Sequence, residues 1–134
     1  KRCGPILNGT WQMVTGGIEP GEAAWQAGLR EVKEETGLIP DRFYCADTVE
    51  TFYMVNRDQI FMVPVFVAFI DTHHEVILSP KEHDAFEWVS KDEAKKRLVW
   101  AEQRRCVDVV YNEFIMKKPS DYLIIPIPDM VYRQ

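Results

Sequence analysis

The feature that most constrains the fold is a loop of turn-forming residues that leads straight into a helix. The loop, Thr15–Gly21, contains three glycines and one proline, which favour irregular backbone. Strong helix formers dominate the next stretch, from Glu22 to Thr36. Gly37 then suits the position after the last helical turn, and Pro40 follows as a stop. The sequence therefore predicts a helix over Glu22–Thr36 that is entered from an irregular loop.

Four segments are predicted to be strands, and two of them are expected to pair as a hairpin. Phe43–Val55 and Gln59–Ile70 are rich in the β-branched and aromatic residues that favour strands. Asn56-Arg57-Asp58 lies between them as the expected turn. Pro64 is expected at a bulge or an edge, because proline cannot donate to a strand ladder. The two shorter strands are expected at Trp11–Val14 and Ala85–Val89.

Two further helices are predicted in the second half of the chain. Ser90-Lys91-Asp92-Glu93 matches a capping box and is expected to start the first of them. The second is expected to cover about Ala101–Met116, with four apolar residues at helical spacing on one buried face. These four are Cys106, Val109, Val110 and Phe114. Strands that alternate with helices indicate an α/β or α+β sandwich.

Charge and cysteine content restrict the partners of the chain. The net charge of −5 argues against a nucleic-acid binder that relies on a broad basic face. The longest apolar run, Ile60–Ile70, is interrupted by Pro64 and is too short to span a bilayer. The three cysteines lie far apart and show no C-x-x-C spacing, which favours a reducing, cytoplasmic location over a disulfide framework.

The predicted first helix concentrates negative charge on one side. Glu31 lies about 60° around the helix from Glu34 and about 40° from Glu35. Carboxylates at these spacings repel one another, so the helix gains no stability from them. A hard divalent cation such as Mg²⁺ would relieve the repulsion, since it takes oxygen ligands and binds carboxylates together with substrate phosphates. The alternative interpretation is an ordinary solvated acidic face.

The loop and helix together resemble the Nudix box, G-x5-E-x7-R-E-U-x-E-E-x-G-U, in which U is apolar. Every specified position is occupied between residues 16 and 38. The residues are Gly16, Glu22, Arg30, Glu31, Val32, Glu34, Glu35, Gly37 and Leu38. The resemblance implies a Nudix α/β/α sandwich with a central mixed β-sheet. It also implies Mg²⁺-dependent hydrolysis of a nucleoside diphosphate linked to another group, with Mn²⁺ as a second candidate metal.

The resemblance also implies roles for individual residues. Glu34 and Glu35 would be metal ligands, and Glu31 would be a ligand or the base that activates water. Arg30 would orient the carboxylates, and the carbonyl near Gly16 would be a further ligand. Glu22 would be a structural partner of the loop and helix. The carboxylate that the family usually adds from outside the box is expected to be Glu82, in a segment resembling E-H-x4-W that ends at Trp88. His83 is expected to be a loop residue, because Mg²⁺ prefers oxygen.

The sequence constrains the identity of the substrate less than it constrains the type of reaction. The segment before the box, together with Glu82-His83, looks like that of the dihydroneopterin triphosphate pyrophosphatases, which also hydrolyse dATP. Release of pyrophosphate and a monophosphate is then expected, from a nucleoside or pterin triphosphate. Three aromatic residues are candidates for stacking on the base, and one arginine for contacting phosphate. These are Trp11, Tyr53, Trp100 and Arg42, each of which has packing or solvation as the alternative role.

Two other functions stay open at this point. One is a Nudix hydrolase specific for ADP-ribose or a dinucleoside polyphosphate, and the other is a Nudix module that binds a nucleotide without cleaving it. We expect residues 1–134 to form a single Nudix domain that lacks the family's first strand. The expected partner is a small-molecule polyphosphate, and the sequence leaves the oligomeric state open.

Overall fold

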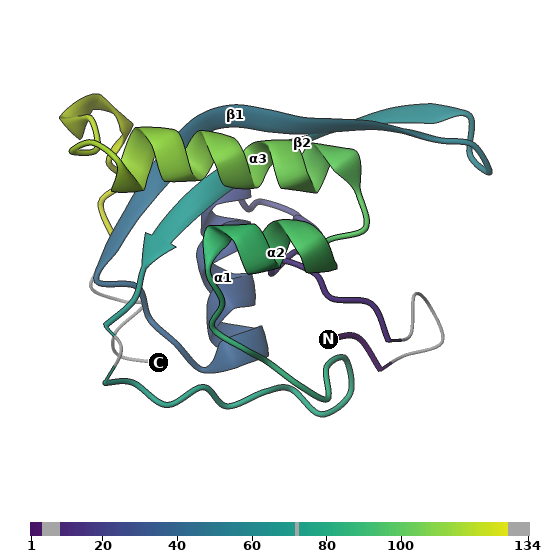
Figure 1. The fold of residues 1–134 in the computed structure, drawn as a ribbon, viewed down its shortest axis with the longest axis horizontal. Coiled ribbons are helices and arrows are strands. Elements are labelled where there is room, and N and C mark those ends of the chain that lie inside the picture. Colours follow the sequence, from purple (N-terminus) through teal and green to yellow (C-terminus); the bar gives the residue numbers. More distant parts are fainter. Residues whose placement is uncertain (4–8, 72, 129–134) are drawn as a thin grey trace.

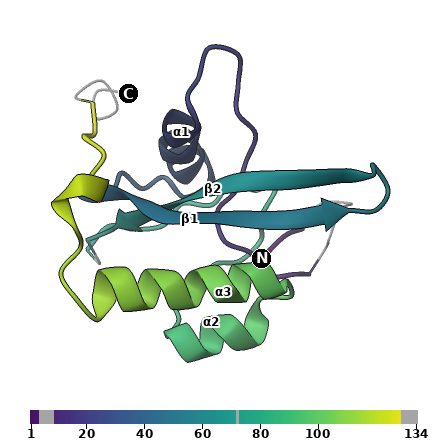
Figure 2. The ribbon, with the colours of Figure 1, turned by 90° about the horizontal axis from the view of Figure 1, so that it is seen from above.

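The computed structural model of the protein describes residues 1–3, 9–71 and 73–128. A long antiparallel hairpin, β1 (Arg42–Met54) and β2 (Gln59–Phe69), forms the middle layer. The helix α1 (Ala24–Thr36) lies on one side of it, and α2 (Lys91–Arg97) and α3 (Ala101–Val110) lie on the other (Figures 1 and 2). The predicted three-layer α/β arrangement is therefore confirmed. No helix in the described ranges is long and apolar enough to cross a membrane.

The predicted hairpin is confirmed, with its turn at residues 55–58. Its register changes between Cys45, which pairs with Phe66, and Val49, which pairs with Pro64. An advance of four residues along β1 is thus matched by two residues along β2, which is a β-bulge. Within this bulge Asp47 has a left-handed backbone conformation, with φ of 56°. Pro64 lies at one end of this bulge, as expected for a residue that cannot donate a ladder hydrogen bond.

The ends of α1 largely follow the sequence signals. Gly37 has φ of 72°, and its N–H donates to the Lys33 carbonyl at 2.8 Å, which closes the last turn as predicted. The helix begins at Ala24, two residues later than predicted. The side chain of Gln26 accepts a hydrogen bond from the Ala23 N–H at 2.7 Å, so this amide caps the helix. Glu22 is thereby left outside the helix, with its carboxylate available for the site.

Both later helices are present, and the second ends differently from the prediction. The Ser90 hydroxyl accepts from the Glu93 N–H at 3.2 Å, which is one half of the predicted capping box. The second helix changes after Val110 into a π-helical turn, η1 (Tyr111–Ile115). The predicted inner face is confirmed at its two ends, because Cys106 and Phe114 are buried. A short 3₁₀ helix, η2 (Asp121–Leu123), follows.

Two predicted strands are wrong. Trp11–Val14 contributes one parallel bridge, Trp11 to Leu98, rather than a strand, and Ala85–Val89 contributes no strand. In the described residues the regular sheet is the antiparallel pair β1–β2, and the expected mixed character is limited to single bridges. A physical reason is visible in the second segment, where residues 86–89 are all exposed, so neither face of this segment is buried.

Aromatic packing fixes α1 and η1, which continues from α3, against opposite faces of the hairpin. Phe43 stacks on Phe66 with ring centroids 5.4 Å apart, next to the helix backbone at Gly28. A Cβ at Gly28 would lie 3.2 Å from the Phe66 ring, so glycine permits this close approach. On the other face, Tyr44 meets Phe114 edge to face. The contacts of Phe43 and Phe66 with Gly28 hold α1 against the hairpin.

Candidate active site

Arg30 is the centre of an ion-pair network that joins the loop to the helix. Its Nε and Nη2 donate to the two oxygens of Glu22 at 2.9 and 3.0 Å, a bidentate pair. Nη1 donates to Glu31 at 2.9 Å and to Glu34 at 3.1 Å. Nη2 also donates to the Gly17 carbonyl at 2.7 Å. One planar guanidinium therefore fixes two of the predicted metal ligands and the loop beside them.

Glu22 acts as the link between loop and helix. One of its oxygens accepts from the Glu19 N–H at 3.0 Å while both bind Arg30. The Arg30 hydrogen bonds, followed by the Glu19 amide, lower the pKa of Glu22, and the same pairing raises the pKa of Arg30. Both groups thus stay charged, and the loop conformation is tied to the orientation of Arg30.

Glu35 points inward and meets two other carboxylates. It is only 5% exposed. Burial, followed by the Glu31 and Glu82 carboxylates, raises the pKa of Glu35 to about 8. A buried carboxylate among other carboxylates needs either a proton or a cation to be stable. The predicted contribution of Glu82 from outside the box is supported by this contact, since Glu82 is far from the box in sequence.

A turn of the chain docks on the end of α1 and brings Glu82 to the cluster. The Ile77 N–H donates to the Thr36 carbonyl at 2.8 Å. The Ser79 carbonyl then accepts from the N–H groups of Glu82 and His83 at 3.3 and 3.2 Å. The turn therefore fixes the backbone of both residues against the helix end.

The carboxylate cluster fits a divalent cation. Glu35, Glu82 and His83 each offer a ligand atom within 4.8 Å of the others. The Nδ1 atom of His83 is buried and has no hydrogen-bond partner in the described part of the chain. His83 lies in the turn that follows Ser79, and its expected role as a loop residue rather than a ligand stays a prediction. Its imidazole would suit Mn²⁺ better than Mg²⁺, whereas the carboxylates suit both.

Gly16 lies against Glu31 with no space for a side chain. A Cβ on Gly16 would lie 2.1 Å from the Glu31 carboxyl carbon. The glycine therefore allows this carboxylate to occupy its position beside the loop. The predicted ligand role of the backbone carbonyl near Gly16 stays a prediction.

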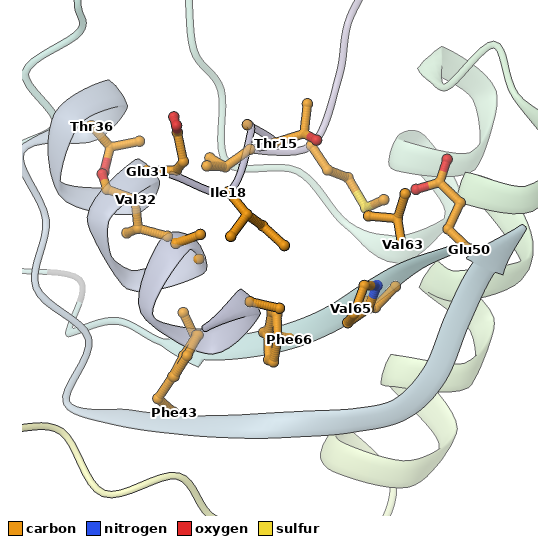
Figure 3. A pocket seen from close by; sticks show the side chains of 18 of the residues that line it. Thr15, Ile18, Glu31, Val32, Thr36, Phe43, Glu50, Val63, Val65 and Phe66 are labelled. Carbon is orange, nitrogen blue, oxygen red and sulfur yellow. The ribbon is translucent and has the colours of Figure 1, made fainter. Parts of the chain in front are cut away.

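A pocket of about 430 Å³ opens beside this cluster, between the loop, α1 and β2 (Figure 3). Gly16, Glu31 and Thr36 line it on the helix side. Its walls are mainly apolar, and they include Ile18, Val32, Val65 and Phe66. A pocket with apolar walls that also reaches Glu31 of the carboxylate cluster suits a ligand with a flat apolar part and a phosphate chain.

None of the four predicted substrate-contacting residues lines the pocket that the described residues form. The ring of Trp11 lies under the Arg97 guanidinium at 5.0 Å, and Arg42 lies over the Phe69 ring at 4.3 Å. The Tyr53 hydroxyl donates to Asp58 at 2.6 Å near the hairpin turn, and Trp100 is half-exposed before α3. Their substrate roles stay predictions, and this arrangement brings none of them to the glutamates.

Two polar residues that the sequence did not single out, Glu50 and Gln103, line the pocket, and so does Trp88. Trp88 carried a weak signal, because it ends the segment that begins at Glu82. Glu50 and Gln103 carried none, since a carboxylate in a strand and an amide in a helix are usually solvated.

A family model for the NUDIX domain matches residues 1–110. The bis(5'-nucleosyl)-tetraphosphatase (asymmetrical) of Caenorhabditis elegans is 30% identical over 93 residues, which cover 69% of this chain and 67% of that protein. A protein of Myxococcus xanthus named octanoyltransferase is 36% identical over 106 residues, or 77% of this chain. The chain spans only 29% of that second protein's length.

Solved structures are similar over most of the chain. The C. elegans Ap4A hydrolase, in a binary complex, aligns with a TM-score of 0.65 and 27% identity, covering 77% of this chain and 75% of that one. The E. coli dihydroneopterin triphosphate pyrophosphohydrolase aligns with a TM-score of 0.63 and 22% identity, covering 80% and 77%. At that identity the second similarity shows the fold alone.

Proposed function

Since this chain belongs to the Nudix family, we propose that it is a Mg²⁺-dependent hydrolase of phosphoanhydride bonds in small nucleotide-like substrates. The observation that carries the proposal is the cluster of four glutamates, in which Arg30 holds Glu31 and Glu34, and the buried Glu35 meets Glu31 and Glu82. Glu31 also lines the apolar pocket. All box glutamates are present, which argues against a module that binds nucleotides without cleaving them.

The proposed metal ligands are Glu31, Glu34, Glu35 and Glu82, with the carbonyl near Gly16 as a further donor. When bound, the cation neutralises charge on the phosphate oxygens and lowers the pKa of a water molecule. Arg30 holds Glu31 and Glu34 in one orientation through a shared Nη1 atom. The protein thereby avoids reorganising these groups during the reaction.

The chemical step is attack of water on a phosphorus in line with the leaving oxygen. Glu31 or Glu82 accepts the proton of the attacking water, since both carboxylates lie next to the buried Glu35. The anhydride bond breaks as the new P–O bond forms. From a nucleoside or pterin triphosphate, the products are a monophosphate and pyrophosphate.

The proposed substrate class is a nucleoside or pterin triphosphate. The pocket volume of about 430 Å³ supports one ring system rather than two. A second candidate is a dinucleoside polyphosphate, which is favoured by the 30% identity to the C. elegans tetraphosphatase. ADP-ribose has no comparable support.

A product assay separates these substrates. We expect dihydroneopterin triphosphate or dATP, incubated with Mg²⁺ and the protein, to give a monophosphate and pyrophosphate by mass spectrometry. Diadenosine polyphosphates and ADP-ribose should be consumed at least about 10-fold more slowly. Chelation of the metal should stop all turnover. Consumption of only the diadenosine compounds would favour the second candidate, and no turnover of any compound would contradict hydrolase function.

A further inference from the structure

The pocket has a second polar end, away from the glutamate cluster. Figure 3 shows Glu31 and Thr36 at one end and Glu50 at the other, with Ile18, Phe66 and Val65 between them. Gln103 also lines the pocket. The proposed hydrolase mechanism uses neither Glu50 nor Gln103.

Gln103 is a buried amide with an unsatisfied atom. Its residue exposure is 7%, and its Oε1 atom has no hydrogen-bond partner in the described part of the chain. A buried carbonyl oxygen without a donor lowers stability, so such groups are rare unless a ligand or water supplies the donor. Gln103 is among the residues that line the adjoining pocket.

The backbone around Glu50 is fixed to the helix turn that carries Gln103. The Thr51 N–H donates to Glu102 Oε1 at 3.2 Å, and Arg105 Nη2 donates to the Val49 carbonyl at 2.8 Å. Arg105 Nε also donates to Glu102 Oε2 at 2.7 Å. Hydrogen bonds therefore clamp the strand on both sides of Glu50 to α3, so that Glu50 and Gln103 belong to one preorganised unit.

The raised pKa of Glu50 fits a partly buried carboxylate that would gain from accepting a hydrogen bond. Burial, followed by repulsion from Glu102, raises the pKa of Glu50, whereas Arg105 opposes the shift. Glu50 is only partly exposed. A donor that approached Glu50 from the pocket would compensate for part of its lost hydration.

We propose that Gln103 and Glu50 select the ring system of the substrate by accepting hydrogen bonds from N–H groups of an amino-substituted nitrogen heterocycle. This inference rests on the proposed function. Two acceptors at one end of an apolar slot complement a ring N–H next to an exocyclic amine. Guanine and the pterins share this edge, while hypoxanthine lacks the amine.

The test measures kcat/KM for two matched substrates, dGTP and dITP, which differ only in the exocyclic amine. The wild-type protein should prefer dGTP by about 10-fold or more, the usual size of one specific hydrogen-bond contact to a base. Gln103→Leu and Glu50→Leu should each bring this ratio towards one. Glu50→Gln, which keeps an acceptor oxygen, should restore part of the preference.

Matched controls separate selection from folding. Gln59→Leu and Glu75→Gln change exposed residues away from the pocket and should keep the wild-type ratio. The melting temperature of Gln103→Leu should not fall, because the substitution removes an unsatisfied buried oxygen. A purely structural glutamine would give a lower melting temperature and an unchanged ratio, which would overturn the proposal. If Gln103→Leu does not fold, the wild-type ratio and the Glu50 variants decide.

The outcomes also distinguish this inference from the proposed function. Turnover of both triphosphates with a wild-type ratio near one would overturn the inference and leave the hydrolase function standing. No turnover of any triphosphate would overturn the inference together with the proposed triphosphate class, and the hydrolase function would be overturned only if the diadenosine polyphosphates and ADP-ribose were also left intact. Dihydroneopterin triphosphate is the third substrate to test. If its kcat/KM is higher than that of dGTP, the ring that Gln103 and Glu50 select is a pterin. If its kcat/KM is lower, the selected ring is a purine.

Discussion

Glu35→Gln is expected to lower the rate of Mg²⁺-dependent triphosphate hydrolysis by about 100-fold or more, because it removes a charged ligand at the centre of the cluster. The amide is nearly isosteric with the carboxyl group, so packing around this buried side chain should persist. The measurement is steady-state kinetics with a triphosphate substrate, together with the melting temperature of each protein. We expect kcat to fall while the apo protein keeps its melting temperature, since a neutral amide relieves repulsion among carboxylates.

The matched control for this prediction is Glu113→Gln. Glu113 is exposed on η1 and pairs with Lys117 at 2.6 Å, far from the box in sequence. The Glu113→Gln protein should keep its fold, because exposed ion pairs contribute little to stability. Its hydrolysis rate should therefore stay within about twofold of the wild-type rate. A Glu35→Gln protein that folds and retains a rate within threefold of the control would contradict the assignment of Glu35 as a ligand.

Gly16→Ala is expected to lower kcat by about 100-fold without unfolding the protein, a size typical of losing one positioned charged group. The added Cβ would lie 2.1 Å from the carboxyl carbon of Glu31, so this side chain has to move. Movement is possible because Glu31 is a flexible side chain, and stability should therefore change little. This movement of the Glu31 side chain would, however, separate its carboxylate from Arg30 and from Glu35.

Gly17→Ala is the neighbouring control. A Cβ at Gly17 would meet nothing within 4 Å, and the backbone carbonyl that accepts from Arg30 is kept. Its kcat should therefore stay within about threefold of the wild type, as expected for a surface change. Equal loss in both variants would show that loop flexibility, rather than the position of Glu31, matters for catalysis.

The helix α1 and the hairpin were predictable because the residues that determine them lie within or next to each element. Gly37 closes α1, and the turn at residues 55–58 joins two segments of clear strand composition. Helical spacing also placed Glu31, Glu34 and Glu35 on one side of α1. Arg30 now holds two of these glutamates, while the third points inward.

The features that were missed depend on contacts between distant segments. The pocket end formed by Glu50 and Gln103 exists because α3 docks on β1 through Glu102 and Arg105. No periodicity within either element reports this docking. The segments Trp11–Val14 and Ala85–Val89 were predicted as strands, but a short segment does not itself supply the partner edge that a strand needs. The aromatic residues expected at the substrate were chosen by residue type, which does not distinguish stacking on a ligand from packing on a neighbour.

The central claim is that Glu31, Glu34 and Glu35 hold a cation that contacts the phosphate chain of the substrate. A crystal structure with Mg²⁺ and a non-cleavable nucleoside triphosphate analogue tests it most directly. We predict a cation bound by oxygens of these glutamates, at distances of about 2.0–2.1 Å, and by a phosphate oxygen of the analogue. Bound analogue with these three carboxylates turned away from its phosphates, and with no cation between them, would contradict the claim.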